Sequence, residues 1–475
     1  MLYVMGAILL FLVILFIRAA MFLPNESQAF PIEAVQLDET KIISDLTDMI
    51  RCKTVSHPDD EWTDKEEFEK FRSVLALRFP NVHTKTELNH IGKTGLLYHW
   101  RGKKSNAPCV LMSHYDVVPV EEDVWQKPPF EGVLENGVLW GRGTLDTKTT
   151  LLGVIYAAEQ LLETGFVPEQ DIWLAFSGDE EVMGVSCPLI VAELEKRGVK
   201  PAMVLDEGGA IVENVFPGVT KPAALVGIAE KGLANVSFSM ESRGGHASTP
   251  PVHTIIGKLA QAVVAVESHP FRSKLTKPVA ELFDTLGRHA GFGWRILFAN
   301  LWCFQPLLDL FCRISGGELN AMLRTTCAFT QMSGSKAGNV LPPKADITAN
   351  MRLIGGDTLD TIMTHLNKVV HDPDVHIHLI AGMNPSISSD TNCTEWNKLK
   401  QVIKSTWPEA IVSPYLMMQC SDSRHFCRIT DRVYRFSAMS LTKQERSTIH
   451  GHDERVPVET VLKTVAFYQR LILQL

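Results

Sequence analysis

Short apolar runs in the first half of the chain predict buried β-strands. Three of them cover residues 110–112, 172–176 and 203–205. Continuous apolar runs of this length, bounded by Gly, Pro and Ser, are typical of strands that are covered on both faces. A helical pattern over residues 149–164 follows the first strand and ends before Gly165. This alternation of strand and helix predicts an α/β domain with a mostly parallel sheet.

Helices are expected at both ends of this domain. Residues 35–80 alternate acidic and apolar positions, which predicts amphipathic helices before the sheet, with Pro80 closing one of them. Residues 236–240 and 433–436 have the pattern of short strands, and residues 457–475 that of a closing helix. The chain is therefore expected to return to the α/β domain near its C-terminus.

Acidic and imidazole side chains follow each of the three predicted strands. His114 and Asp116 come after the first, Asp179 to Glu181 after the second, and Asp206 and Glu207 after the third. In open α/β sheets, ligands collect at the carboxyl ends of the strands. We therefore expect these side chains to converge on one edge of the sheet.

The residue types at this edge are those of a metal site. One nitrogen and several carboxylate oxygens suit zinc, with manganese or cobalt as possible substitutes; the candidate ligands are His114, Asp146, Glu181 and Asp206. Asp116 can accept the second ring N–H of His114. Asp146, on a Gly-flanked turn, is suited to bridge two ions, and Glu180 to deprotonate water.

Each of these residues also has a simpler interpretation. A single His at a strand end is more often a hydrogen-bonded structural residue, and the acidic run Asp179–Glu181 could be solvated surface or a helix N-terminal charge cluster. Asp206 and the residues after it could form only a turn. Their joint occurrence at successive strand ends favours the metal site.

Length and composition narrow the class of protein. The chain has 475 residues, which favours two domains, and 45% of them are hydrophobic. The net charge of −8 gives no basic excess that would favour nucleic acid as a partner. The nine Cys are scattered without a paired metal spacing, so they are expected to pack in the core rather than to bind metal.

The N-terminus has the features of a secretory or membrane segment. Residues 2–17 are apolar and uncharged, and continuing through Arg18 to Leu23 reaches the length of a membrane span. Residues 1–23 are thus expected to be a signal peptide or a signal anchor, with the rest of the chain lumenal or extracellular. Three glycosylation sequons agree with this route, at Asn25, Asn235 and Asn392.

Four motifs resemble those of a known family of enzymes. They are His114–Pro119, Gly141–Lys148, Gly178–Glu181 and Asp206–Gly209. The chain is similar, over about residues 40–475, to the dizinc aminoacylase and carboxypeptidase family, which includes bacterial glutamate carboxypeptidase and yeast carboxypeptidase S. The resemblance implies two Zn²⁺ per subunit, Glu180 as the general base, and His450 as a further ligand. His452 is a nearby rival that is out of register with the motif.

The resemblance also implies the domain organisation. Residues 35–230 and 372–475 correspond to the catalytic domain, and residues 231–371 to an inserted ferredoxin-like lid that can form a homodimer interface. In the lid, His246 corresponds to a residue that polarises the substrate carbonyl, often from the partner subunit. Residues that correspond to substrate-binding positions are Asn339, Arg352 and Arg424.

A strongly apolar stretch inside the expected lid is not explained by these motifs. Residues 292–304 and 306–311 are mostly hydrophobic, but Arg295, Pro306 and Asp309 interrupt them, so the stretch is not a convincing membrane span. It could be lid core or a dimer interface. It could also be a surface that accepts an acyl chain or meets lipid.

The function expected from the resemblance is zinc-dependent hydrolysis of an amide bond. The branch of the family that hydrolyses and forms N-fatty-acyl amino acids is the nearest in motif. A carboxypeptidase or dipeptidase of short peptides is one alternative, and a non-catalytic metal-bound binding protein is another. Two departures, Thr147 where a second Asp is common and Val182–Met183 where small polar residues are frequent, remove neither a ligand nor the base.

Overall fold

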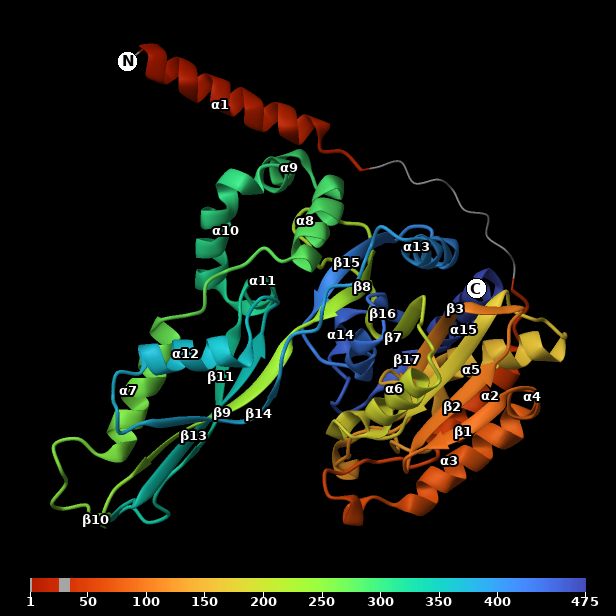
Figure 1. Cartoon of the computed structure of the whole chain (residues 1–475), viewed down its shortest axis with the longest axis horizontal. Helices are drawn as coiled ribbons and strands as arrows, with labels where there is room; N and C mark the ends of the chain where they lie inside the picture. Colours follow the sequence, from red (N-terminus) through yellow and green to blue (C-terminus); the bar gives the residue numbers. More distant parts are fainter. Residues whose placement is uncertain (1, 25–34) are drawn as a thin grey trace.

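In the part of the chain that the structure describes, the two largest sheets, of eight and four strands, lie side by side, each with its own helices (Figure 1). The computed structural model describes residues 2–24 and 35–475. The chain leaves the larger sheet after strand β8 (Ala223–Glu230) and enters the smaller sheet at β9 (Gly232–Glu241). It leaves the smaller sheet after β14 (His376–Met383), beyond the boundary at residue 371 that we expected. An α/β domain with an inserted α+β lid is thus confirmed.

The larger sheet has eight strands in the order β1-β2-β6-β3-β7-β16-β8-β15. Besides β8, its strands are β1 (Glu87–Ile91), β2 (Gly95–Trp100), β3 (Lys104–His114), β6 (Gln170–Ser177), β7 (Met203–Val212), β15 (Ile411–Met417) and β16 (Val433–Ser440). The central four, β6, β3, β7 and β16, are all parallel. Their carboxyl ends therefore meet at the same edge of the sheet.

Helices cover both faces of this sheet because its central strands are apolar on both sides. In β3, Leu111 contributes to one hydrophobic cluster, and Val110 and Met112 to another on the opposite face. The first cluster packs helices α2 (Glu39–Ile50), α3 (Lys65–Arg78), α4 (Pro80–Lys85), α5 (Lys148–Glu163), α13 (Thr394–Thr406) and α15 (Val458–Gln474). The second packs α6 (Ser186–Lys196) and the short helix η4 (Asp422–Arg428).

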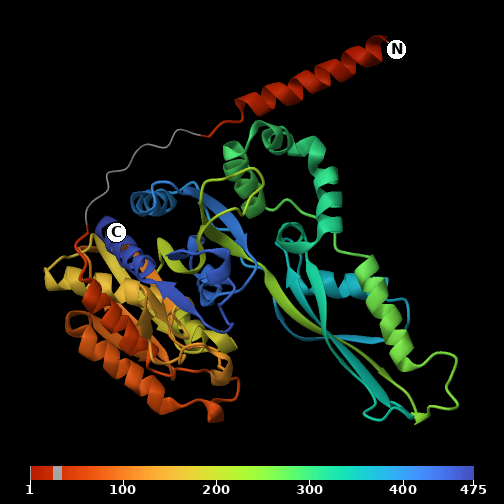
Figure 2. The ribbon, with the colours of Figure 1, turned by 180° about the vertical axis from the view of Figure 1, so that it is seen from behind.

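The lid has the strand order of a ferredoxin-like domain. Its sheet runs β11-β13-β9-β14, with β11 at Thr326–Ser333 and β13 at Lys344–Leu353. Helices α7 (Ile255–Ser268) and α12 (Leu359–Val369) pack on this sheet in a βαββαβ order. A two-stranded ladder, β10 (Gly245–His246) with β12 (Val340–Leu341), extends from it. Figure 2 shows the same arrangement from behind.

The apolar stretch of the expected lid is not part of the lid core. It forms α9 (Phe292–Phe298) and α10 (Leu301–Ser315), between α8 (Lys277–His289) and α11 (Gly317–Leu323). These helices share a hydrophobic cluster with β8 and β15, at the edge of the catalytic sheet. Helix α1 (Leu2–Met21) packs against α9 and is, by length and composition, able to cross a membrane.

Several local expectations need correction. Pro80 does not only close a helix but begins α4, since its missing N–H costs nothing at the first helical position. Strand β7 continues past Asp206 to Val212, because Gly208 and Gly209 allow it to bulge and then approach β8 closely.

The sequon at Asn25 lies outside the described residues. Asn392 is exposed. Asn235 lies in β9, where its side chain accepts a hydrogen bond from the side chain of Asn350. A side chain engaged within a sheet is a poor position for a glycan.

Candidate metal centre

His114, at the end of β3, has its two ring nitrogens in different environments. Nδ1 lies 3.1 Å from the backbone oxygen of Asp116 and 3.3 Å from its carboxylate. An oxygen can only accept here, so Nδ1 carries the proton, and the lone pair of Nε2 is left to bind a metal. Nε2 faces Oδ1 of Asp146 at 2.9 Å. Both the backbone and the side chain of Asp116 are thus placed to accept from this ring N–H.

Asp146 lies between two imidazoles. While Oδ1 faces His114, Oδ2 lies 3.1 Å from Nε2 of His450. The same nitrogen of His450 lies 2.9 Å from a carboxylate oxygen of Glu181. A carboxylate that directs one oxygen to each of two histidines has the geometry needed to bridge two ions.

His450, not His452, belongs to this cluster. Its backbone has φ of 58°, the left-handed region that a non-glycine residue rarely adopts. Its hydrogen bonds with Asp146 and then Glu181 raise the pKa of the imidazole to about 10. His452 is exposed. Of the two histidines that the sequence offered, His450 is thus the one that lies against Asp146 and Glu181.

The loop that holds Asp146 is fixed by Glu454, from the far end of the chain. Strand β17 (Arg455–Pro457) pairs with β5 (Val138–Trp140) and places Glu454 beside the turn. The Glu454 carboxylate, fully buried, accepts from the backbone N–H groups of Gly143 and Leu145. It also forms an ion pair of 2.7 Å with Arg142. One acid thereby joins the His450 loop to the Asp146 loop.

Asp116 organises the Glu180–Glu181 segment. Its two carboxylate oxygens accept from the backbone N–H groups of Glu180 at 3.2 Å and Glu181 at 3.1 Å. Ser56 donates to it as well, at 2.7 Å. These contacts fix the start of the short helix η3 (Glu180–Val182), so the two neighbouring glutamates point in defined directions.

The acids at this edge outnumber the two imidazoles that face them. Burial raises the pKa of Glu181 and of Asp206, and it raises the pKa of Glu180 and of Glu207 well above the usual value. Asp206 lies on β7, next to β3, and accepts from the backbone N–H of Ser423 at 3.1 Å. Burial would lower the pKa of His114, but hydrogen bonds with Asp116 and Asp146 raise it well above its usual value.

These residues fit a pair of divalent cations. Ionised carboxylates with little solvent are costly unless they are paired or bind metal. Ligand atoms of His114, Asp146 and Glu181 lie within 4.8 Å of one another. Imidazole with carboxylate oxygens is a donor set that zinc accepts, while other first-row metals accept it too. The donor chemistry thus supports a dinuclear site and leaves the identity of the metal open.

A cavity of about 620 Å³ opens on this cluster. Its polar end is lined by Asp146, Glu180, Glu181, Glu207 and His450. The rest of its wall is mostly apolar and includes Val215, Phe216, Leu282, Leu286, Met322, Met417 and Met418. Helices α8 and α11 contribute part of this wall. Glu318, Lys443 and Arg446 also line the cavity, but apolar side chains predominate, which suits a substrate with both a polar amide and an apolar tail.

The expected lid residues do not gather around the cluster in this chain. His246 is exposed on β10, where its Nδ1 interacts with the hydroxyl of Ser248, and Asn339 accepts from the N–H of Ala247. Figure 1 shows β10 at the outer tip of the lid, away from the catalytic domain. His246 and Asn339 are thus near each other and far from the acids.

The two expected arginines lie at the junction of the domains instead. Arg352, on β13, contacts Sγ of Cys420 at 3.7 Å, and Cys420 lines the cavity. Arg424 donates to the backbone oxygen of Asn384 and lies 3.6 Å from Glu230. Both are therefore near the mouth of the cavity or the hinge, rather than beside the metal cluster.

Sequence reasoning missed some of the residues that hold the site together. Glu454 and Arg142 were not among the candidates, although Glu454 is part of the motif around His450. Glu207 was noted only as following a strand, and it lines the cavity beside the cluster. All three residues are charged and lie within the motifs quoted from the sequence, and this could have marked them as candidates. Glu454 and its partner Arg142 are about 300 positions apart in the sequence, and no local pattern reveals such a pairing.

Comparison with known proteins gives consistent results. A model of Peptidase family M20/M25/M40 matches residues 110–474. The chain is 36% identical over 444 residues to probable carboxypeptidase S-like 2 of Dictyostelium discoideum, covering 92% of this chain and 85% of that protein. It is 32% identical over 454 residues to the N-fatty-acyl-amino acid synthase/hydrolase PM20D1 of Xenopus tropicalis, with coverages of 94% and 88%. Its fold resembles an M20 family metallo-carboxypeptidase from Sulfolobus solfataricus, with a TM-score of 0.67, 16% identity and coverages of 92% and 99%.

Proposed function

Since the chain belongs to Peptidase family M20/M25/M40, whose members are dinuclear metal hydrolases, we propose that it hydrolyses N-fatty-acyl amino acids and forms them in the reverse direction. The products of hydrolysis are a fatty acid and an amino acid. One catalyst lowers the same barrier for both directions, so the concentrations of the reactants decide which direction prevails. The observation that carries this proposal is the apolar cavity beside the acids.

Two further observations support this substrate class. A relative of 32% identity carries the name of an N-fatty-acyl-amino acid synthase/hydrolase, and similarity extends over most of both chains. The cavity wall contains three methionines, Met322, Met417 and Met418. Methionine side chains are flexible and adapt to apolar ligands of varied shape. An acyl chain could therefore lie along this wall while its amide reaches the acids.

The proposed ligands are His114, Asp146, Glu181, Asp206 and His450, with Asp146 between the two ions. Bound Zn²⁺ would supply a water whose pKa falls from 15.7 toward about 7, together with polarisation of the substrate carbonyl. Glu180 takes the proton from the attacking water and then passes it to the leaving amine. Asp116 holds both His114 and the backbone of Glu180 in place for these steps.

We also propose roles for the lid. His246 would stabilise the oxyanion from the lid of a second subunit, because its position at the tip of its own lid is far from its own cluster. Asn339 would bind the substrate beside it. Arg352 and Arg424, near the domain junction, would attract the substrate carboxylate. The enzyme would act on the lumenal or extracellular side of a membrane, a placement supported by the length and apolar composition of α1.

A peptidase function is the second candidate. The chain is 36% identical to a protein named as a probable carboxypeptidase S-like enzyme. The polar end of the cavity would accommodate a peptide amide as readily as an acyl amide. The two candidates differ in whether the apolar wall contributes to binding. The remaining alternative, a non-catalytic metal-bound protein, is not supported by membership in a family of hydrolases.

A substrate panel tests the proposal. Purified protein would be assayed with N-oleoyl, N-octanoyl and N-acetyl forms of one amino acid, and with dipeptides that carry the same C-terminal residue. We expect kcat/KM to rise with acyl length and activity to be lost on chelation and regained with Zn²⁺. Each methylene that the cavity buries contributes about 0.8 kcal/mol at most. Faster turnover of dipeptides than of every acyl amide would favour the peptidase instead.

A further inference from the structure

The outer face of α9 and α10 is apolar and uncovered. Large hydrophobic side chains are exposed along it, among them Trp302 at 60% and Ile314 at 79%. The others are Phe292, Trp294, Leu307, Leu310 and Phe311. In α10 the exposed positions 307, 310, 311 and 314 follow helical spacing and form one stripe. Exposed apolar surface of this extent marks an interaction site.

The charged residues of this segment are arranged to leave the stripe neutral. Asp309, the only acid of α10, is turned inward to pair with the buried Arg324. Arg295 lies over the ring of Phe292 instead of projecting freely. The exposed Arg313 lies at the C-terminal end of α10. An apolar face with aromatic residues and with positive charge at its end is typical of a helix that lies in the interface of a membrane.

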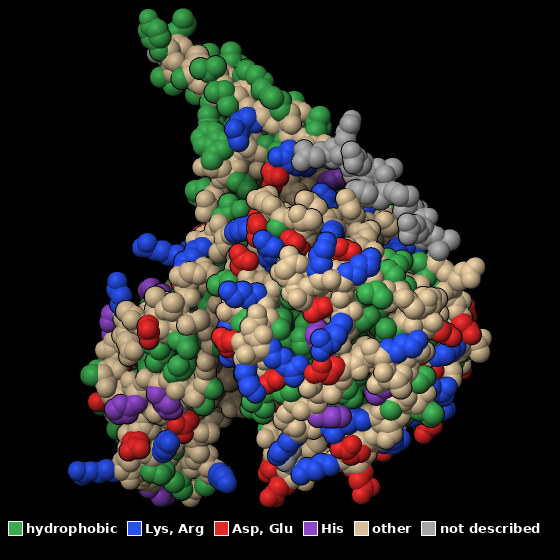
Figure 3. Space-filling view, turned by 45° about the vertical axis from the view of Figure 1, so that its right-hand side comes forward, with side chains coloured by type: hydrophobic (Ala, Val, Ile, Leu, Met, Phe, Trp, Pro, Cys, Tyr) green, Lys and Arg blue, Asp and Glu red, His purple; other side chains and the backbone are tan. Residues whose placement is uncertain are grey.

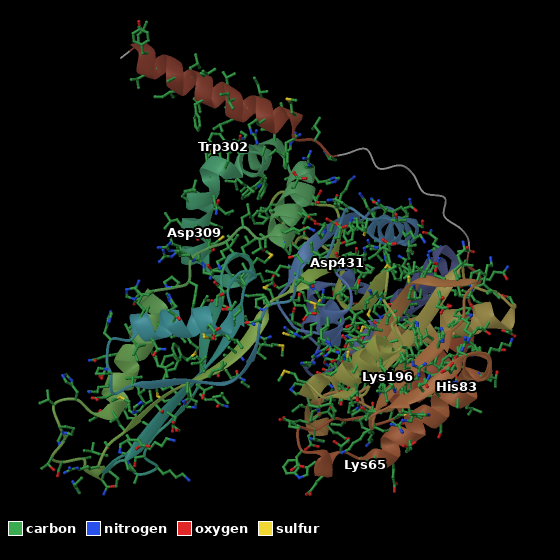
Figure 4. The ribbon with its side chains drawn as sticks, in the orientation of Figure 1. Lys65, His83, Lys196, Trp302, Asp309 and Asp431 are labelled. Carbon is green, nitrogen blue, oxygen red and sulfur yellow. The ribbon has the colours of Figure 1, made fainter. Side chains whose placement is uncertain are left out.

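This face is continuous with α1. Phe11 packs edge-on against Trp302 at 6.0 Å, and Phe16 lies 6.1 Å from Phe292. Figure 3 shows hydrophobic side chains along α1, and Figure 4 places Trp302 where α10 begins, next to α1. Helix α1 has 20 residues, a length of about 30 Å at 1.5 Å per residue, which matches the hydrocarbon core of a bilayer.

The C-terminal part of α1 is tied to α9 by specific polar contacts. Arg18, the single charge in α1, donates to the backbone oxygen of Ala299 and to the side chain of Asn300. Asn300 is fully buried and donates to the backbone oxygen of Leu15. Removal of α1 would leave these buried groups without these partners, at a cost in stability.

The segment after α1 continues the attachment. Phe22 packs near Gly287 and lies under the guanidinium of Arg288, 4.5 Å from the ring centre. Arg288 also donates to the backbone oxygen of Leu23. The end of α1 is therefore held by α8 as well as by α9. These contacts fix the position of α1 relative to the exposed stripe.

We propose that α1 is retained as a membrane anchor and that the outer face of α9 and α10 lies in the lipid bilayer beside it. The occupant of this face is lipid, because the face is continuous with α1, a helix of membrane-spanning length. In addition, the acid of α10, Asp309, points away from the face toward Arg324. The inference does not depend on the proposed substrate. It would nevertheless place α8 and α11, which line the cavity, next to the membrane from which an acyl substrate is drawn.

Photocrosslinking tests this placement. A benzophenone amino acid would be introduced at Phe311 of the full chain, with Leu77, an exposed residue of α3, as the matched control. Both proteins would be reconstituted in vesicles of phosphatidylcholine and phosphatidylserine, illuminated, and analysed by mass spectrometry. We expect lipid adducts at position 311 to exceed those at position 77 by about tenfold or more. Circular dichroism would verify that both proteins are folded.

Other outcomes would overturn the proposal. Adducts between two chains at position 311 would show that a second copy covers the face. Equal lipid labelling at positions 311 and 77 would show that the stripe is not in the bilayer. Retention of α1 is tested separately, by the intact mass of protein purified from the membranes of cells that express the full chain. A mass that lacks the residues before Arg18 would refute the anchor.

Discussion

Glu180 and Glu181 are neighbours in sequence but have different surroundings. The carboxylate of Glu181 faces His450 at 2.9 Å, as expected of a ligand. Glu180 is held through its backbone by Asp116, and its side chain lines the cavity. Burial raises the pKa of the Glu180 carboxyl well above its usual value.

Exchange of these two acids for amides is predicted to have different effects. Glu180→Gln should keep both metal ions and lower kcat by about 10²–10⁴-fold, the usual contribution of a general base. Glu181→Gln should lower the metal content itself. Metal analysis alongside steady-state kinetics distinguishes the two results. Near-normal turnover by Glu180→Gln would reject its assignment as the base.

At this scale the sequence predicted which strand-end side chains come together. Residues placed directly after apolar runs, such as His114 and Glu181, could be expected to meet, since parallel strands end at a common edge. Glu454 could not be anticipated in the same way, because its role depends on the pairing of β17 with β5. His246 was expected near the active site of a partner, and within its own chain it lies elsewhere.

Among the secondary structure elements, the buried strands were the most predictable. Strand β6 and helices α5 and α15 lie where the patterns placed them, within two residues, while β3 begins six residues before its predicted start. The packing of α8–α11 was not predictable, since an apolar helix does not encode which sheet it covers. In the structure these helices share a cluster with Ile411 and Leu416 of β15, to which the lid contributes Ile354, the residue after β13. That choice is what gives the cavity its apolar wall.

The element-scale prediction concerns this wall. Met418 follows β15 and lines the cavity, and it is only partly buried, so a larger side chain can be accommodated there. Met418→Trp should reduce the space for an acyl chain and lower kcat/KM for N-oleoyl substrates about tenfold or more, with little effect on N-acetyl substrates. Val167→Trp, at an exposed site, is the control. A uniform loss on both substrates would argue against an acyl pocket.

At the scale of the whole molecule, the tip of the lid lies away from the domain that holds the acids (Figure 1). Figure 1 shows the lid directed away from the catalytic domain, with β10 at its end. If His246 takes part in catalysis, another subunit must supply it, and the active site is complete only in a dimer. Dimers with twofold symmetry would then contain two equivalent shared sites.

Mixing two inactive variants tests this directly. His246→Ala and Glu180→Gln should each be nearly inactive alone. In a mixed dimer, one site would combine an intact Glu180 with an intact His246 from the other subunit, while the second site would lack both. Random exchange in an equal mixture makes about half of the dimers mixed, so about a quarter of wild-type activity should return. Mixed dimers that form but remain inactive would show that His246 does not act across the interface, and full activity of His246→Ala alone would remove it from the mechanism.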